Sequence, residues 1–382
     1  MPALEWIFTE EHRQLREAVR RLMEREVAPR AAEVDETERY PWEGVRAAAA
    51  AGLFGIHLPA ELGGQGRDLL SWYLVMEEAG RACANLANVL VGTWMCASLV
   101  RLAGSAELQA EVLPRMARGE RLGVIAVTEP HAGSDAATIT TAAVREGEQY
   151  VLRGEKWLIA SAGQADVYAL LAVTDPGAGT RGTTAFLVDK DAPGLSFERQ
   201  PTMGLRGLWT GWVRLDQVKV PASRVLGRPG EGFKNIMRLF DRSRPAVSAM
   251  CIGMGQAALD YAVRYAKGRP AFGKTVADFQ GIQFLLADMF AELEAARALV
   301  YDAAMRLERD PDGRHTAAAS LAKLKATDML MRLTTDAVQV VGGYGYTRAC
   351  PLERLMRDAK SFQILEGTNQ IHRMLLAREL LR

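Results

Sequence analysis

The spacing of apolar residues changes from helical to strand-like and back to helical along this chain, and no other feature constrains its fold as strongly. Up to about residue 121, alanine-rich segments near 10–29, 41–52, 69–103 and 106–119 follow a helical period. From about 122 to 228, short apolar or alternating runs lie between turn residues, as is typical of β-strands. After Gly232 the helical period returns and continues to the end.

The C-terminal part has the longest of these helical patterns. One apolar stripe from Phe279 to Leu307 predicts a helix of about thirty residues. Similar patterns cover 233–267, 315–341 and 369–381, and together they favour a four-helix bundle. Because helices of this length with wide apolar faces often pack against another subunit, we expect a homo-oligomer.

The order of these zones predicts a mainly α protein with a central β domain. We expect an N-terminal helical domain at 1–121, an antiparallel, β-barrel-like middle domain at 122–228, and a C-terminal helical bundle at 229–382.

Charge and cysteine content exclude several classes of protein. The 382 residues carry 47 basic and 46 acidic side chains, with no basic run, so the sequence does not indicate nucleic-acid binding. The four cysteines (Cys83, Cys96, Cys251 and Cys350) are far apart, and the five histidines show no ligand spacing. We therefore expect neither a disulfide scaffold nor a metal site.

No secretory signal is visible at the N-terminus, and we expect a cytoplasmic protein. The 19 residues 82–100 are uncharged and resemble a membrane span in length. They include Asn85 and Asn88, which are costly in hydrocarbon but acceptable in a protein interior. The sequence therefore predicts a buried core helix there and no membrane span.

Several well-known motifs are absent or out of context. Residues 268–275 match the phosphate-loop pattern, but a helical stretch precedes them where a buried strand is needed, and Pro270 removes one N–H donor. No Gly-x-Gly-x-x-Gly follows a predicted strand, and no Gly-x-Ser-x-Gly is present. The sequence thus offers no nucleotide-triphosphatase, nicotinamide or serine-nucleophile site.

Three local clusters are not explained by helix packing. The first, at 127–135, follows a predicted strand and contains small and hydroxyl residues, although a capped turn would look similar. The second, at 339–346, has three glycines that suit a helix end or a close approach to phosphate. The third, at 357–370, places Glu366 between apolar residues and a glycine, just before the last helix.

Together these clusters resemble the acyl-CoA dehydrogenase family over nearly the whole chain. The matching segments follow the family's order, and five in order make chance agreement very unlikely. They are Pro59-Ala60-Glu61-Leu62-Gly63-Gly64-Gln65-Gly66, Thr128-Glu129-Pro130-His131-Ala132-Gly133-Ser134-Asp135, Arg269-x-x-Phe272-Gly273-Lys274, Gln339-x-x-Gly342-Gly343-x-Gly345 and Glu366-Gly367-Thr368.

The resemblance implies non-covalent FAD and α,β-dehydrogenation of an acyl-CoA thioester to the trans-2-enoyl-CoA. Glu366 would remove the α-proton, and the flavin N5 would accept hydride from the β-carbon. Some relatives carry the base elsewhere, but that position is Ser243 here, so Glu366 has no rival. The alternative for Glu366 is a structural acid that interacts favourably with the N-terminus of the last helix.

The resemblance also assigns binding residues. Cofactor contacts would come from Ile125, Val127, Thr128, Gly133, Ser134, Leu158, Ala160, Arg269, Phe272, Gln280, Gln339, Gly342, Gly343, Thr368 and Gln370. Substrate contacts would come from Ser134, Asp241, Arg244 and Gly367. In the family, contacts such as those of Arg269 and Gly343 are made to the flavin of a neighbouring subunit, so a tetramer, or else a dimer, would complete the site.

The chain departs from the family at His131, where a glycine is common, at a leucine within 204–210, where relatives often have serine or threonine, and at two positions that bear directly on the flavin. Relatives usually have tryptophan at Leu158, where it covers the flavin, and threonine or serine at Ala160, where the hydroxyl bonds near N5. A one-residue slip would give these roles to Trp157 and Ser161. An electron-transferring flavoprotein is the expected acceptor, while an acyl-CoA oxidase, an enoyl-CoA reductase, a desulfinase-like enzyme or a non-enzymatic CoA- or flavin-binding protein remain alternatives.

By family position, the helix around 86–100 would line the acyl pocket. Trp94 on this helix either shortens that pocket or packs in the core.

Overall fold

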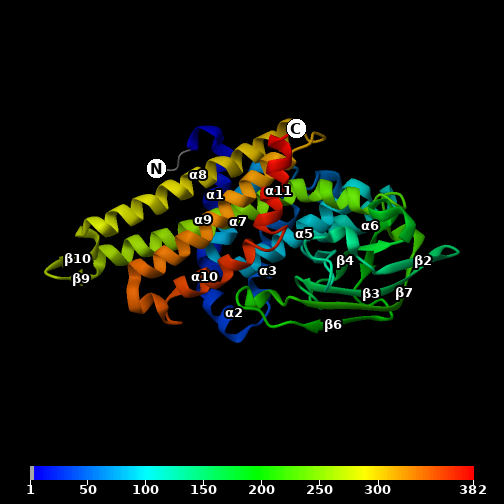
Figure 1. The fold of residues 1–382 in the computed structure, drawn as a ribbon, viewed down its shortest axis with the longest axis horizontal. Helices are drawn as coiled ribbons and strands as arrows, with labels where there is room; N and C mark the ends of the chain where they lie inside the picture. The colour runs from blue at the N-terminus through cyan, green and yellow to red at the C-terminus, as the bar shows by residue number, and fades with distance from the viewer. Residues whose placement is uncertain (1–3) are drawn as a thin grey trace.

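A computed structural model describes residues 4–382. The prediction that the N-terminus has no secretory signal also covers residues 1–3, which lie outside the described range. The chain forms helices, then a sheet, then helices again, as the sequence predicts (Figure 1). The first group consists of α1 (Glu10–Leu22), α2 (Ala31–Thr37), α3 (Trp42–Ala50), α4 (Leu69–Ala82), α5 (Ala84–Ala103) and α6 (Ala106–Ala117).

The predicted helical stretch 69–103 is two helices, because Cys83 between α4 and α5 is extended, with φ −160°. Among the described residues, α5 and α7 (Gly232–Gly268) are long and apolar enough to span a membrane. In each helix, however, 72% of the most apolar window is buried inside the molecule, as in a core helix.

The central region forms one eight-stranded sheet in the order β6-β7-β3-β2-β4-β5-β8, with β1 added beside β4. Its strands are β1 (Gly123–Ala126), β2 (Ala142–Glu146), β3 (Gln149–Ile159), β4 (Val167–Val173), β5 (Thr183–Asp189), β6 (Leu195–Arg199), β7 (Gly211–Pro221) and β8 (Val225–Leu226). Most pairs are antiparallel, as predicted, but β4 pairs in parallel with β1 and, at one residue, with β2. The intervening β2–β3 hairpin is the connection that parallel pairing of β1 and β4 requires.

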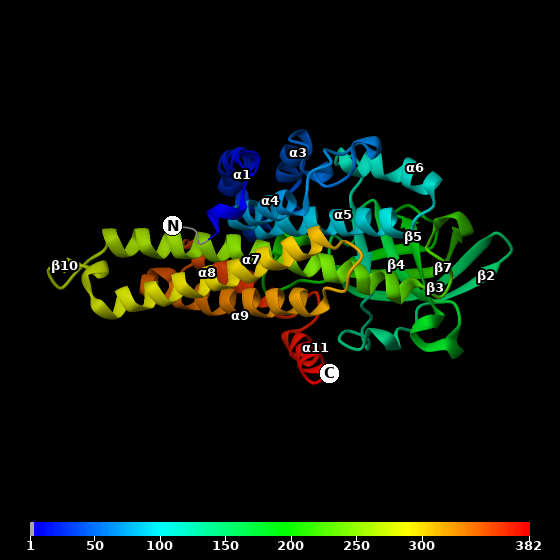
Figure 2. The same cartoon turned by 90° about the horizontal axis from the view of Figure 1, so that it is seen from above.

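The C-terminal part consists of α7, α8 (Gln280–Arg309), α9 (Thr316–Val341), α10 (Pro351–Phe362) and α11 (Asn369–Leu380). The long helices α7, α8 and α9 lie side by side, with the sheet at one end and the β9–β10 hairpin (Pro270–Ala271 and Lys274–Thr275) at the other (Figures 1 and 2). Figure 2 shows α11 and the N-terminal helices on opposite sides of this layer. The sequence patterns did not identify α10.

Helices α4 and α7 cross at two glycines, which bring their backbones together. A Cβ on Gly80 would lie 2.4 Å from the Met250 carbonyl oxygen, and one on Gly253 would lie 1.8 Å from that of Glu77. Both distances are far below van der Waals contact, so only glycine fits at this crossing.

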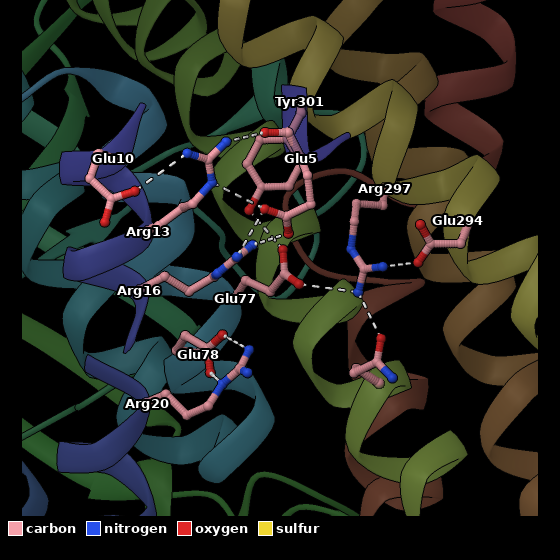
Figure 3. Close-up of polar contacts among 11 residues, drawn as sticks. Glu5, Glu10, Arg13, Arg16, Arg20, Glu77, Glu78, Glu294, Arg297 and Tyr301 are labelled. Carbon is pink, nitrogen blue, oxygen red and sulfur yellow. Dashed lines mark hydrogen bonds and ion pairs between the residues drawn. The ribbon is translucent and has the colours of Figure 1, made fainter. Parts of the chain in front are cut away.

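Ion pairs attach α1 to this core (Figure 3). Arg20 of α1 binds the buried Glu78 of α4 at 2.6 Å. The neighbouring Glu77 lies 3.2 Å from Arg297 of α8 and accepts a hydrogen bond of 2.7 Å from the Tyr301 hydroxyl. These contacts explain the ionisable side chains on the inner faces of α4 and α8 without a catalytic role.

The three parts of the chain meet at α10. Arg357 binds Asp35 of α2 at 2.6 Å, and the buried Asp358 accepts a hydrogen bond of 2.6 Å from the backbone N–H of Leu205, which precedes β7. Burial raises the pKa of Asp358 to about 6, although the Leu205 N–H opposes the shift.

We expect this carboxyl group to make folding stability depend on pH. Because its pKa is higher in the folded than in the unfolded chain, the folded state binds more protons between about pH 4 and 6, and stability falls as pH rises through that range. The Asp358→Asn variant should lack this contribution, which is about 2–3 kcal/mol. Urea unfolding of both proteins at pH 4.5 and 7 measures it, and equal pH dependence in both would contradict the assignment.

Candidate active site

Glu366 lies in a strained turn between α10 and α11. Its φ is 59° and that of Gly367 is 92°, both in the left-handed region. For a non-glycine residue this conformation costs about 1 kcal/mol or more, so the surrounding structure must hold it. The Glu366 carbonyl oxygen lies 3.2 Å from both Arg244 Nε and His372 Nε2, and the backbone N–H of Asn369 closes the turn onto the Gln363 carbonyl at 3.1 Å.

The Glu366 carboxylate points to α7, where the Ser243 hydroxyl donates a hydrogen bond of 2.7 Å to Oε2. Burial raises the pKa of Glu366, while the Ser243 hydrogen bond and the positive charges of Arg244 and Lys323 partly oppose the shift. A desolvated carboxylate with a raised pKa is suited to act as a general base.

The predicted substrate residues Asp241 and Arg244 lie beside this turn. Their side chains are 3.4 Å apart, and Asp241 also accepts a hydrogen bond of 2.7 Å from Thr316. Asp241 lines a hollow of about 160 Å³ that also includes Arg238, Arg242 and Arg314. The structure thus brings Glu366, Gly367, Asp241 and Arg244 together, next to a hollow lined by three arginines and two aspartates.

The loop after β1 is shaped by a buried ion pair. Lys156 and Glu129 are almost completely buried, with Nζ and Oε1 2.7 Å apart, and Nζ also donates to the Val127 carbonyl at 3.0 Å. Burial opposes ionisation of Glu129, but the charge of Lys156 and the hydrogen bonds from Lys156, Thr140 and Thr141 together outweigh it and lower the pKa of the carboxyl. The pair fixes the backbone on either side of Thr128.

The predicted flavin contacts on this loop are open to a ligand. Gly133 and Ser134 are exposed, and a Cβ on Gly133 would meet nothing within 4 Å. Within residues 4–382 their backbone N–H groups make no hydrogen bond. Ile125, which lies in β1, and Thr128 are half-buried, whereas Val127 is buried.

The end of β3 determines whether Trp157 and Ser161 take the roles expected at Leu158 and Ala160. The strand is irregular there, and Leu158 has φ 56° and is 44% exposed. Trp157 packs against Trp212 with ring centroids 5.6 Å apart, and the buried Ser161 hydroxyl is hydrogen-bonded to Tyr40 at 2.8 Å. The hydroxyl of Ser161 is therefore already used within the protein.

A second group of predicted cofactor residues lies at the far end of the bundle. Arg269 and Gly343 line a hollow of about 510 Å³ together with Tyr265, Val276, Val340, Val341 and Tyr344. Gly342 and Gly343 leave open space where a Cβ would be, and Phe272 at the hairpin tip is 95% exposed. Gln280 begins α8, and Gln339 lies near the end of α9.

One chain does not bring the two groups of cofactor residues together, because the sheet and the hairpin are at opposite ends of the long helices (Figures 1 and 2). Each group nevertheless fits part of an FAD molecule. The arginine and the open glycine backbone at the far end suit a pyrophosphate, and the exposed N–H groups after β1 suit a polar ring edge. The remaining predicted contacts, Thr368 and Gln370, lie directly after the Glu366 turn.

Trp94 lies in the core of the N-terminal part. It is 4% exposed and stacks on Trp72, with ring centroids 5.5 Å apart. Its position therefore favours the packing interpretation.

Sequence reasoning missed several residues that contact the Glu366 turn, namely Lys323, Asp328 and His372. Lys323 could have been identified from the sequence, because it lies on the otherwise apolar face of a long predicted helix. A lysine buried in such a place almost always has a partner.

Comparison with known proteins identifies the family. Models of the acyl-CoA dehydrogenase N-terminal, middle and C-terminal domains match residues 9–120, 124–218 and 230–381. The probable acyl-CoA dehydrogenase fadE25 of Mycobacterium leprae is 44% identical over 98% of this chain and 96% of that protein.

Solved structures of acyl-CoA dehydrogenases superpose closely on this chain. Butyryl-CoA dehydrogenase from Megasphaera elsdenii superposes with a TM-score of 0.95 at 37% identity, covering 98% of this chain and 99% of that one. A glutaryl-CoA dehydrogenase from Mycobacterium smegmatis in complex with FADH2 has a TM-score of 0.93 at 25% identity, covering 99% of this chain and 96% of that one. The chain therefore belongs to the acyl-CoA dehydrogenase family, and it is an FAD-dependent enzyme that dehydrogenates an acyl-CoA.

Proposed function

We propose that Glu366 is the base that removes the α-proton of the acyl-CoA, giving the trans-2-enoyl-CoA. The observation that carries this proposal is the desolvated Glu366 carboxylate, held by Ser243 beside Asp241 and Arg244. FAD, when bound, supplies the two-electron acceptor that takes hydride from the β-carbon. The proton goes to the carboxylate, so the thioester loses one proton and one hydride.

The other side chains bind and orient. Arg244 and Asp241 would contact the CoA portion, and Ser134 and Gly367 the thioester end of the substrate. The backbone N–H of Glu366 would donate to the thioester carbonyl, where negative charge develops as the α-proton leaves.

We further propose that a second copy of the chain completes the cofactor site, in a tetramer. The support is that Thr128 and Ser134 follow β1 of the sheet, whereas Arg269 directly precedes the β9–β10 hairpin at the opposite end of the long helices, where Phe272 is exposed at the hairpin tip. We place the enzyme in the cytoplasm, in the catabolism of fatty or amino acids, with an electron-transferring flavoprotein as acceptor.

One observation favours a second candidate, an acyl-CoA oxidase on the same scaffold. Leu158 is exposed and aliphatic, Ala160 has no hydroxyl, and Ser161 is engaged by Tyr40. A flavin with less cover at this position would be more accessible to oxygen. Peroxide release during turnover in air, compared with the rate of dye reduction, distinguishes the oxidase from the dehydrogenase.

Anaerobic titration of the FAD-loaded protein with a panel of straight, branched and cyclic acyl-CoAs tests the main proposal. We expect at least one acyl-CoA to bleach the flavin absorbance stoichiometrically, with formation of the enoyl-CoA. A protein that binds FAD and acyl-CoA but shows no bleaching with any member of the panel would contradict the proposed reaction.

A further inference from the structure

Lys323 is buried in an unusual way. It lies on the inner face of α9, its side chain is fully buried, and among the described residues no carboxylate is within ion-pair distance of its ammonium group. Burying an ammonium without a bonded carboxylate is costly, so a lysine in such a place requires an explanation. Neither the packing of the bundle nor the predicted cofactor and substrate contacts supplies one.

The ammonium group binds Gly367 and Asn369, which follow Glu366 closely in the chain. Lys323 Nζ donates to the Gly367 carbonyl at 2.8 Å and to Asn369 Oδ1 at 2.8 Å. Arg244 and His372 bind the carbonyl oxygen of Glu366, and Lys323 binds that of Gly367. Both carbonyl groups of the left-handed turn are therefore hydrogen-bonded.

The next turn of α9 holds the same loop. Asp328 accepts hydrogen bonds of 2.7 Å from the side chains of Gln363 and Asn369, one on each side of Glu366. Thr327 donates to Asn369 at 3.0 Å. Helix α9 therefore fixes both ends of the segment that carries the base.

Few groups near the turn change charge in the working pH range. On α7, Arg244 remains a cation, and burial raises the pKa of the Cys251 thiol, which remains neutral. On α11, burial and the two cations lower the pKa of His372 to about 3, so it is neutral. On α9, hydrogen bonds from Asn369 and Gln363 and the charge of Arg373 outweigh the effect of burial and lower the pKa of Asp328, so it is ionised.

Lys323 therefore places a positive charge next to the turn that carries Glu366. Burial lowers the pKa of its ammonium to about 8, and it is mostly charged at neutral pH. Its charge favours the ionised form of Glu366, which is the form able to accept a proton.

We propose that Lys323 is a positioning residue for the base: it holds the Glu366–Gly367 turn in its left-handed conformation and places a positive charge beside the turn that carries the carboxylate. This inference rests on the proposed role of Glu366.

The pH dependence of flavin reduction in the Lys323→Met variant tests the inference. We use the FAD-loaded full chain under anaerobic conditions with an acyl-CoA that bleaches the wild type. The maximal reduction rate should fall about tenfold or more, because a displaced base loses proton-transfer geometry. In a plot of the reduction rate against pH, the rise on the acid side (the acid limb) reports ionisation of Glu366. This limb should move to higher pH by about one unit, because Glu366 loses a neighbouring positive charge. Acyl-CoA affinity should change little.

Lys325→Met is the matched control. Lys325 is on the same helix but is partly exposed and pairs with Glu292 at 2.5 Å, so its removal should leave the limb in place. If Lys323→Met does not fold or does not bind FAD, Lys323→Gln replaces it, with the same shift expected. An unmoved limb overturns the proposal, and so does loss of fold or flavin in both variants, because Lys323 would then be purely structural.

The Glu366→Gln variant separates this inference from the proposed function. If that variant still reduces the flavin, the base assignment itself fails. If it is inactive but the limb of Lys323→Met does not move, only the role of Lys323 is wrong.

Discussion

The Glu366→Gln variant should bind FAD and acyl-CoA as the wild type does but reduce the flavin about 10³-fold more slowly or not at all. Glutamine has nearly the same shape and can still accept the Ser243 hydrogen bond, so the left-handed turn and its contacts should survive. An amide cannot take up the α-proton at neutral pH, and no other carboxylate was identified for this task. Stopped-flow measurement of flavin absorbance under anaerobic conditions gives the rate.

A suitable control is Glu148→Gln, in the exposed turn between β2 and β3, where the side chain is 94% exposed. It should reduce the flavin at the wild-type rate. Rapid bleaching by the Glu366→Gln protein would show that Glu366 is a structural acid at the start of α11.

The second large effect concerns stability. Gly253→Ala should lower the free energy of unfolding by more than about 3 kcal/mol, at the upper end of overpacking costs. The added methyl group would lie 1.8 Å from the Glu77 carbonyl oxygen, which belongs to a helix backbone and cannot move aside like a flexible side chain. The helices α4 and α7 would have to separate, and the contacts of Glu77 with Arg297 and Tyr301 would be disturbed. Thermal and urea unfolding measure the loss.

Gly268→Ala is the control on the same helix. Nothing lies within 4 Å of a Cβ there, so the variant should be as stable as the wild type or more stable by up to about 1 kcal/mol. If Gly253→Ala unfolds at the same urea concentration as Gly268→Ala, then α4 and α7 are not packed closely enough at Gly253 to exclude a methyl group.

The fold class follows from local sequence information. Hydrophobic period identified the helical and strand regions, since each element buries one face, and the family comparison confirms the resulting architecture. The break at Cys83 was not predicted, because apolar residues continue through it and the helical period gives no signal of an extended residue. Helix α10 was missed because its sequence was interpreted as part of a ligand-binding cluster.

The candidate site was only partly predictable. Glu366, Asp241 and Arg244 are recognisable from their motifs, and the structure brings them together; their proposed roles stay predictions. Lys323 lies more than 40 residues before the turn it contacts, so no local pattern links them. The same is true of Ser161 and Tyr40, whose hydrogen bond spans 121 residues and determines which hydroxyl is left for a ligand.

The hydrogen bonds to the Glu366 turn come from α7, α9 and α11, all in the C-terminal half of the chain. The walls that α5 would contribute to an acyl pocket belong to a different part of the molecule. If α5 does line the acyl pocket, substitutions on that helix would change the space for the acyl group while every residue that hydrogen-bonds the Glu366 turn stays the same, so substrate preference and the base would be encoded in different parts of the chain.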